Sequence, residues 1–386
     1  MHNSVQNYIA GSFGVLDMDR LIYFAKKAGL NFITAHTICA EDSRKTHNGI
    51  IYPNLGLVFL TASKRQVNLL FPSNGSSPLH FIEQEVDYFP LQNEADLNQT
   101  QSTPDLNWGV KSTQAHKSIY TGKGVRVALL DTGIDSNHPD FSKANITKKS
   151  FIEGENSQDG NGHGTHCAGI IIGPKKPNST MRYGISPEVE LFSGKVLKNS
   201  GAAHSRYVFQ GIEWAIQNKC KIISISLGNR VRKGVSYSLS FEKAAQAAAK
   251  KGALIIASAG NDSFRHLQRL LPVSGPANCP SIMAVGAINE ANEMYNRSNS
   301  SININGGIVD LVGPGVAIQS SYTNLQPYKK LSGTSMATSF VTAIAAQYMQ
   351  AYPNKQPDEI RMLLKQNARP LPISSKDAGA GLVQCL

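Results

Sequence analysis

The first candidate for a catalytic side chain is an aspartate at the end of an apolar segment. Asp131 closes the apolar run 125–131 and is followed by Thr132 and Gly133. The triplet Asp-Thr-Gly also marks aspartic proteases, but their chemistry needs two carboxylates that share a proton, and this triplet occurs once. A single aspartate at such a position also serves as a cap or turn residue, so Asp131 alone leaves its role open.

Two histidines follow in the glycine-rich segment 159–169, DGNGHGTHCAG. His163 and His166 are three residues apart at the expected start of a helix. A zinc site would need an H-E-x-x-H arrangement or a third ligand nearby, and the segment has neither, so no metal is expected here. A packed or capping histidine remains the other interpretation.

Two polar side chains complete the set. Asn261 follows the apolar run 253–260, where its amide is able to donate a hydrogen bond, although asparagine is also a common turn residue. Ser335 stands at the expected N-terminus of a helix, where backbone N–H groups stabilise negative charge, although an N-cap serine is equally common there. Each residue taken singly permits a purely structural role.

Alternating apolar runs and helical patterns must position these four side chains. Strands that are apolar throughout are typical of a parallel sheet covered on both faces, so we predict an α/β fold. Functional residues gather at the carboxyl ends of such strands, where the candidates stand. The expected strands are 125–131, 190–197, 222–228, 253–260 and 282–288, and the expected helices are 163–172, 204–218, 241–251 and 335–349.

The first 90 residues carry a different pattern, β-α-β-β-α-β, which predicts a small α+β domain. A polar segment rich in Gln, Asn, Thr and Asp then separates the two patterned regions. We therefore predict a domain at 1–90, an exposed linker at 91–106 and a second domain at 107–386. The expected strands of the first domain are 5–10, 30–38, 55–62 and 79–89, and its expected helices are 17–29 and 63–71.

Composition excludes several classes of protein. The chain has 386 residues, 41% of them apolar, which is enough for a large core and excludes a disordered chain. Its net charge is +11, but the basic residues are scattered over separate loops, so no nucleic-acid partner is expected. No apolar run approaches the roughly 18 residues that a membrane helix needs, so no membrane contact is expected.

The cysteines and the start of the chain predict a compartment. Five cysteines, scattered and without a C-x-x-C pair, favour reduced thiols over a disulfide framework. The start has no basic segment followed by an apolar stretch, so we expect a cytoplasmic protein, with leaderless export as the other route.

Taken together, the four candidates have a diagnostic order. Asp131, His163, Asn261 and Ser335 follow one another at gaps of 32, 98 and 74 residues, an order that resembles the subtilisin-like serine proteases, or subtilases. The resemblance covers about 107–385. It is carried by WGV, GVRVALLDTGIDSNHPDF, DGNGHGTHCAG, KVL, GIEWAI, ISISLG, SAGN, AVGA, GPGV, SGTSMA and GAGLV, which occur in the family's order.

The resemblance implies a serine endopeptidase with a role for each candidate. Ser335 would be the nucleophile, His163 the base that takes its proton, and Asp131 the group that orients the imidazole and stabilises its charged form. Asn261 would form the oxyanion hole with the backbone N–H of Ser335. His166 would have no catalytic role.

Substrate contacts also follow from the resemblance. Family substrates bind as an extended strand between two backbone segments, which correspond here to Gly201, Ala202 and Ala203 and to Ser226, Leu227 and Gly228. Asp262 matches a position at the rim of the primary specificity pocket, where a carboxylate helps to accept a basic side chain. A solvated loop aspartate is the other interpretation of Asp262.

The first domain resembles the inhibitor-type propeptide of subtilases, a ferredoxin-like domain that packs on the enzyme. The opposite charges of the two regions support that pairing, because residues 1–103 hold seven basic against nine acidic residues and the remainder holds 31 against 18. We therefore expect a zymogen that cleaves itself in or near 90–107, with its own propeptide as inhibitor and peptides or proteins as substrates. A permanently attached accessory domain is the alternative.

Three features depart from the family pattern. Cys167 stands where many relatives have valine, and Ser339 and Phe340 replace the usual Pro-His after the serine motif. The loop 171–184 is longer and lacks the Asn-rich calcium-binding pattern of secreted members, so no strong calcium site is expected there. No cofactor is needed for the chemistry.

Functions other than a general endopeptidase make their own demands on the sequence. A peptide transamidase or macrocyclase on the same fold would carry an added element over the site, and no insertion of that size is visible. A protease dedicated to removing leader peptides also fits the sequence. A dead binding module would need a broken triad, and a nucleotide-binding protein would need its glycines after the first strand rather than before it.

Overall fold

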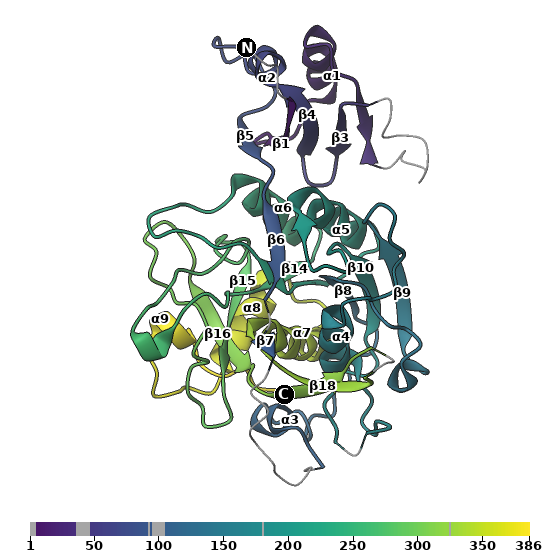
Figure 1. Ribbon diagram of the computed structural model, residues 1–386, viewed down its shortest axis with the longest axis vertical. Coiled ribbons are helices and arrows are strands. Elements are labelled where there is room, and N and C mark those ends of the chain that lie inside the picture. Colours follow the sequence, from purple (N-terminus) through teal and green to yellow (C-terminus); the bar gives the residue numbers. More distant parts are fainter. Residues whose placement is uncertain (1–4, 36–46, 92, 95–104, 180, 324–325) are drawn as a thin grey trace.

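The computed structural model arranges the chain as a small unit above a larger one (Figure 1). The first is built from the early part of the sequence, and the second holds everything after the predicted linker. Most of that linker lies outside the described residues, which are 5–35, 47–91, 93–94, 105–179, 181–323 and 326–386.

A seven-stranded sheet is the centre of the larger unit. Its strand order is β16-β15-β14-β12-β8-β10-β9 and every neighbouring pair is parallel, which confirms the predicted α/β sheet. The five expected strands form its middle, because their runs of Val, Ile, Leu and Ala are buried on both faces. The strands are β8 (Arg126–Asp131), β9 (Asn145–Ser150), β10 (Glu190–Lys195), β12 (Ile222–Ile225), β14 (Leu254–Ser258), β15 (Met283–Ile288) and β16 (Val309–Pro314).

Helices cover both faces of this sheet. In Figure 1, α5 and α6 lie on the side of the small unit, whereas α4 and α7 lie on the opposite side. α7 runs through the core and is buried along nearly its whole length, which explains its Ala- and Thr-rich sequence. No helix in the described ranges combines the length and the apolar character that crossing a membrane requires. The helices are α3 (Trp108–Ser112), α4 (His163–Ile172), α5 (Ser205–Gln217), α6 (Leu239–Lys250), α7 (Thr334–Ala351), α8 (Pro357–Gln366) and α9 (Ser375–Ala378), with 3₁₀ turns at Pro139–Phe141 and Arg265–Leu267.

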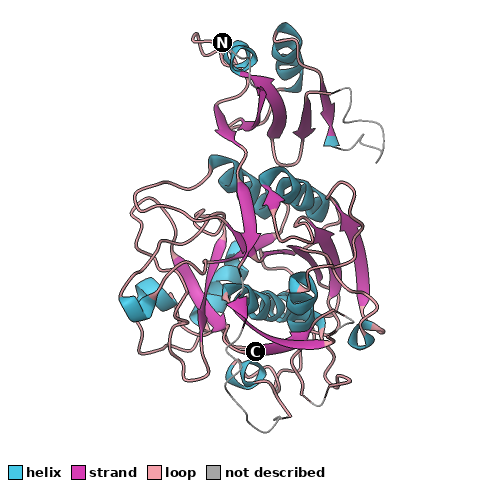
Figure 2. Ribbon diagram, viewed as in Figure 1, coloured by secondary structure: helices cyan, strands magenta, loops and turns pink. Residues whose placement is uncertain are grey.

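The small unit is a five-stranded sheet with two helices on it (Figure 2). Its order is β2-β3-β4-β1-β5, and β1 is antiparallel to both of its neighbours, as in a split β-α-β arrangement. The sequence pattern did not reveal β3, which pairs in parallel with a short β2 at the edge. The elements are β1 (Val5–Gly11), α1 (Met18–Lys27), β2 (Phe32–Thr34), β3 (Gly49–Tyr52), β4 (Leu57–Ser63), α2 (Lys64–Leu70) and β5 (Phe81–Gln84).

The strand expected at 79–89 divides into two, and its second half leaves the small sheet. β6 enters the larger unit (Figure 1) and pairs there, antiparallel, with a strand on either side. The next strand, β7, joins a separate three-stranded sheet of the larger unit with the order β17-β18-β7. These elements are β6 (Asp87–Pro90) between β11 (Ala203–His204) and β13 (Leu227–Gly228), and β7 (Asn93–Glu94) beside β18 (Tyr328–Ser332) and β17 (Ile318–Ser321).

Carboxylates of the small unit cap two helices of the larger one. Glu83 accepts hydrogen bonds from the backbone N–H groups of Leu239 and Ser240 at 2.8 and 3.1 Å, at the N-terminus of α6. Glu85 accepts one at 3.3 Å from the N–H of Arg206, in the first turn of α5. Negative charge is favourable at both places because the first N–H groups of a helix have no partner within it.

The cysteines in the described part of the chain are unpaired. Cys167, Cys220 and Cys279 are buried and Cys385 is partly exposed, whereas Cys39 lies outside the described residues.

Replacement of Glu83 by alanine should weaken the attachment of the small unit. The α6 N–H groups would lose their charged acceptor, so we expect the Glu83→Ala chain to lose about 1 to 2 kcal/mol of unfolding free energy. Urea unfolding measures this loss, with Glu290→Ala, which removes an exposed glutamate, as the control. Equal losses in both variants would contradict the capping role.

Candidate active site

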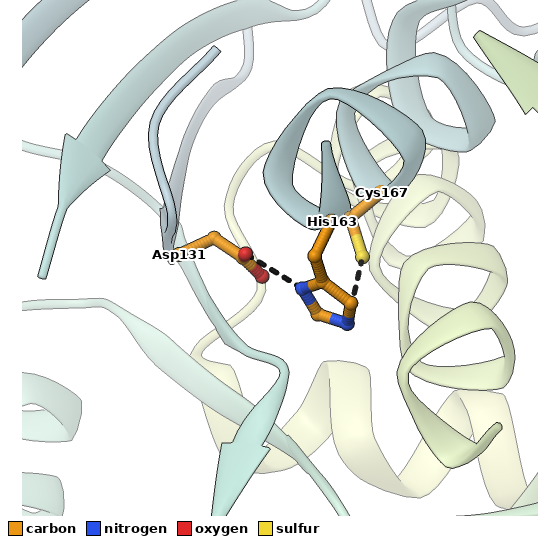
Figure 3. Close-up of side chains that lie close together, drawn as sticks. All are labelled: Asp131, His163 and Cys167. Carbon is orange, nitrogen blue, oxygen red and sulfur yellow. Dashed lines mark hydrogen bonds and ion pairs between the residues drawn. The ribbon is translucent and has the colours of Figure 1, made fainter. Parts of the chain in front are cut away.

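A buried carboxylate and imidazole form the centre of the site. Asp131 is the last residue of β8 and His163 the first of α4, so the two elements bring the side chains together across a separation of 32 residues. His163 Nδ1 lies 2.6 Å from Asp131 Oδ1, and both side chains are shielded from solvent (Figure 3). Because the carboxylate only accepts, Nδ1 carries the proton and Nε2 points away from Asp131.

Asp159 fixes the backbone next to both Asp131 and His163. Its carboxylate accepts from the Thr132 hydroxyl at 2.8 Å, next to Asp131, and from the N–H groups of Gly162 and Thr165 at 2.8 Å each, around the start of α4. The Thr132 hydroxyl in turn accepts from the N–H of Gly164 at 2.8 Å. The sequence analysis missed Asp159, because it stands three residues before the N-cap Gly162 and so outside the position where a capping side chain is recognised from sequence.

Lys195 fixes the backbone that follows Asp131. Its ammonium is fully buried and donates to the carbonyl of Thr132 at 2.6 Å and to Asn199 Oδ1 at 2.8 Å, with Glu155 Oε2 at 3.2 Å. A buried ammonium is stable only with such a set of acceptors, so Lys195 is a second supporting residue that sequence reasoning missed.

The pKa values of the two histidines of α4 are shifted in opposite directions. Burial lowers the pKa of His163, but the charge and hydrogen bond of Asp131, together with the contributions of Cys167, outweigh burial and hold the pKa well above the ordinary histidine value. Burial lowers the pKa of His166 to about 3, so its ring is neutral. His166 Nε2 lies 3.0 Å from the carbonyls of Ile318 and Lys329, and the ring is therefore a structural link to β17 and β18.

Ser335 lies in the first turn of α7, facing a carbonyl of the incoming strand. Its hydroxyl lies 2.8 Å from the Leu91 carbonyl and 3.0 Å from that of Ser226, and its backbone N–H lies 3.4 Å from the same Leu91 oxygen. Among the described residues no hydrogen bond joins Ser335 to His163.

Asn261 presents an unused donor beside Ser335. Its side-chain oxygen accepts from the N–H and the hydroxyl of Thr334 at 3.0 and 2.9 Å, which fixes the orientation of the amide. The amide nitrogen Nδ2 is buried without a partner among the described residues. Buried donors are rarely left unpaired, so this one is prepared for an acceptor that arrives during function.

The two predicted substrate-binding segments flank β6. Ala203 pairs with Tyr88, and Gly201 lies against the ring of Pro90, next to Ala202. On the other side Leu227 pairs with Pro90 and Gly228 with Phe89, while the N–H of Leu91 donates to the carbonyl of Ser226 at 3.4 Å. The segments thus hold part of this chain as a third strand.

The Leu91 side chain is buried and lies against Gly228, and we call this position the Leu91 pocket. A Cβ on Gly228 would lie 2.8 Å from Leu91 Cδ1, so glycine leaves room there for the leucine as it is placed. The same position borders Ser274, whose hydroxyl donates to Asp262 at 3.2 Å. Asp262 also accepts from Asn299 at 3.2 Å, so its carboxylate lies behind Ser274 and already has two donors. A basic-side-chain preference at Asp262 stays a prediction.

The loop considered for calcium, 171–184, donates to a carboxylate from the 3₁₀ turn Pro139–Phe141. Asp140 accepts from the N–H and the amide of Asn178, at 2.6 and 2.8 Å, and from the hydroxyls of Tyr183 and Tyr328, at 2.6 and 3.0 Å. Burial alone would raise the pKa of Asp140, but these donors lower it below the ordinary value. Donors occupy the oxygens that a cation would need.

The sequence is similar to a family of known proteins. The sequence pattern of the Subtilase family matches residues 122–381. Subtilisin Savinase from Lederbergia lenta is 39% identical over 287 residues, which are 73% of this chain and 97% of that protein. An alkaline protease from Alkalihalobacillus alcalophilus is 38% identical over 294 residues, 75% of this chain and 71% of its own. Subtilisin J from Geobacillus stearothermophilus is 36% identical over 270 residues, covering 69% and 66%.

The two histidines should titrate differently. Because its pKa is raised, His163 should keep its positive charge at pH values above about 6.5, where an ordinary histidine has lost it, while His166 should stay neutral down to about pH 3. Nitrogen-15 NMR of the ring nitrogens measures both. Asp131→Asn should lower the pKa of His163 and leave that of His166 unchanged, and a His163 that loses its charge below pH 6.5 would contradict this electrostatic account.

Proposed function

Because this chain belongs to the subtilase family and is a serine endopeptidase, we propose that it is made as a self-inhibited precursor that cuts its own chain after Leu91. The observation that carries the proposal is the 2.8 Å contact between the Ser335 hydroxyl and the Leu91 carbonyl oxygen. Self-cleavage was expected in or near 90–107, and within that range we propose the bond between Leu91 and Gln92.

The chemistry follows from the positions of three side chains. The Ser335 hydroxyl turns toward His163 Nε2, gives up its proton there and forms a bond to the Leu91 carbonyl carbon. Asp131 stabilises the resulting imidazolium without taking the proton. His163 then returns that proton to the amine of Gln92 as the peptide bond breaks, and water releases residues 1–91 from Ser335 as a carboxylate.

The oxygen that becomes negative in this reaction has two donors available. The N–H of Ser335 lies 3.4 Å from the Leu91 oxygen in the uncut state, and the unpaired amide of Asn261 is the second donor. Donors that strengthen their hydrogen bonds as charge develops lower the barrier, and loss of one from such a site costs about 10² to 10³-fold in kcat.

The small unit acts in this proposal as an inhibitor that remains bound after the cut. β6 occupies the strand position of a substrate, and Tyr88 packs its buried ring on Phe241 at 5.4 Å between ring centres. The caps that Glu83 and Glu85 place on α6 and α5 add contacts outside the strand. Substrates in trans then bind as β6 does, with an apolar residue in the Leu91 pocket.

Self-cleavage should be visible as two fragments. We expect the purified chain to yield residues 1–91 and 92–386, with a free carboxylate on Leu91, while Ser335→Ala stays at full length because no nucleophile is present. Intact-mass spectrometry measures both, and Ser142→Ala, at an exposed serine, is the control that should still cleave. A wild-type chain that stays whole would overturn the precursor proposal, and a ligated or cyclic product would favour the transamidase alternative.

A pair of variants on β6 tests the choice of bond. Leu91→Asp places a charge in the apolar pocket, so self-cleavage should slow by about tenfold or more. Phe89→Asp alters a side chain of the same strand that is 53% exposed, and its rate should stay close to that of the wild type. Equal rates for both variants, or a cut elsewhere, would exclude Leu91–Gln92 as the cleaved bond.

We also propose that the loop 171–184 works without calcium, because Asp140 is satisfied by Asn178 and two tyrosine hydroxyls. Excess EDTA should therefore leave Tm unchanged, as thermal unfolding would record. Asp140→Asn should lower stability by about 1 to 3 kcal/mol through the loss of charge-assisted hydrogen bonds. A Tm that falls with EDTA and recovers with added calcium would contradict the proposal.

A further inference from the structure

Acidic residues occupy alternate positions in the stretch that leads to the proposed cut. Glu83, Glu85 and Asp87 are the ninth, seventh and fifth residues counted back from that bond, and the carboxylate of each contacts the larger unit. The side chains between them, Gln84 and Val86, are exposed. The side-chain hydrogen bonds that this five-residue stretch makes to the larger unit therefore come from its acidic residues.

His204 contacts the carboxylate nearest to the cut. It directly precedes α5, and its Nδ1 lies 2.6 Å from Asp87 Oδ1, beside the pairing of β11 with β6. Because the carboxylate only accepts, Nδ1 carries the proton, and a lysine in place of Asp87 would offer it no acceptor. The two side chains are 38% and 60% exposed, so salt screens this contact. His204 thus favours an acidic residue at the fifth position.

Arg206 contacts the second carboxylate. Glu85 Oε1 accepts from the backbone N–H of Arg206 at 3.3 Å and lies 3.8 Å from Nε of its guanidinium. The guanidinium lies over the ring of Tyr207, 4.9 Å from its centre, and donates to the Tyr207 hydroxyl at 3.3 Å. A neighbour within the larger unit therefore orients Arg206. Only 7% of the Glu85 side chain is exposed, so this contact is screened less than the first.

The third carboxylate meets donors at the start of α6. Besides the backbone N–H groups already described there, Glu83 accepts from the Ser238 hydroxyl at 2.7 Å. A basic side chain in place of Glu83 would meet the positive end of the helix and offer its N–H groups no acceptor. This contact also favours an acidic residue, at the ninth position.

We propose that these three contacts extend the substrate groove and select proteins whose cleaved segment carries acidic residues at the fifth, seventh and ninth positions before the cut. His204 and Arg206 are the side chains that determine this preference. The inference rests on the proposed function, because it takes β6 as the image of a substrate bound in trans. Residues 104–386 hold 31 basic against 18 acidic residues, a charge that attracts such segments.

A matched pair of fluorogenic peptides tests the preference. One has the sequence of residues 83–91, and the other has Gln, Gln and Asn in place of its three acidic residues, which keeps the shape and removes the charge. With the self-cut protein, kcat/KM should be about tenfold higher for the acidic peptide, chiefly through a lower KM, because the contacts exist already in the bound substrate. The ratio should fall at about 1 M salt. Equal values for the two peptides would overturn the proposal.

Variants of the two side chains test where the preference arises. The double variant His204→Gln, Arg206→Gln should reduce the ratio between the two peptides to about threefold, since the contact at the start of α6 remains. Lys123→Gln, which removes an exposed positive charge before β8, should keep the ratio of the wild type. A ratio of tenfold in the double variant would exclude His204 and Arg206 as its source.

Hydrogen exchange separates this inference from the proposed function. In the uncut Ser335→Ala chain, adding His204→Gln and Arg206→Gln should raise the exchange rate of the β6 amides about fivefold, because the strand then opens more readily. Adding Lys123→Gln instead should leave the rate unchanged. Unchanged exchange in the first variant would overturn the proposal whether or not the protein is active. Faster exchange in a protein that cleaves no peptide would keep the acidic recognition and refute the proposed function instead.

Discussion

The site depends on one short contact between a carboxylate and an imidazole that are both removed from water. Burying such a pair is costly unless its geometry is fixed, because neither partner keeps its hydration. Much of the local structure therefore fixes it. β8 ends at Asp131, α4 begins at His163, and the buried groups of Asp159 and Lys195 hold the intervening backbone from two sides. The raised pKa of His163 is the electrostatic result of that arrangement.

In the proposed precursor, the closed state is built from the contacts that we propose for a substrate. β6 lies between β11 and β13, and the oxygen of Leu91 meets both the hydroxyl and the N–H of Ser335. The small unit adds charge at the N-termini of two helices, where the larger unit on its own has unpaired N–H groups. The small unit therefore caps α5 and α6 in the same position in which β6 pairs with β11 and β13.

The sequence predicted what local patterns encode and missed what distant contacts decide. The middle strands of the large sheet were predictable, because Val- and Ile-rich runs buried on both faces have a distinct composition. β9 was not, since Asn145–Ser150 is a polar edge strand, and neither was the division of 79–89, because only partners far along the chain draw β6 out of its sheet. The Asp131 and His163 contact followed from motif order, whereas Asp159 and Lys195 emerge only from their buried partners in space.

In the proposed precursor, the strand shared between the two units would also set when activity begins. Before the cut, the tether holds Tyr88 and Leu91 at an effective concentration of about the millimolar range, so occupancy of the groove is nearly independent of how much protein is present. After the proposed cut the same contacts would be bimolecular, and dilution or destruction of the freed fragment would decide how many grooves are open. Activity would then appear with a delay set by local concentration, which makes the onset a property of the population of molecules rather than of any one chain.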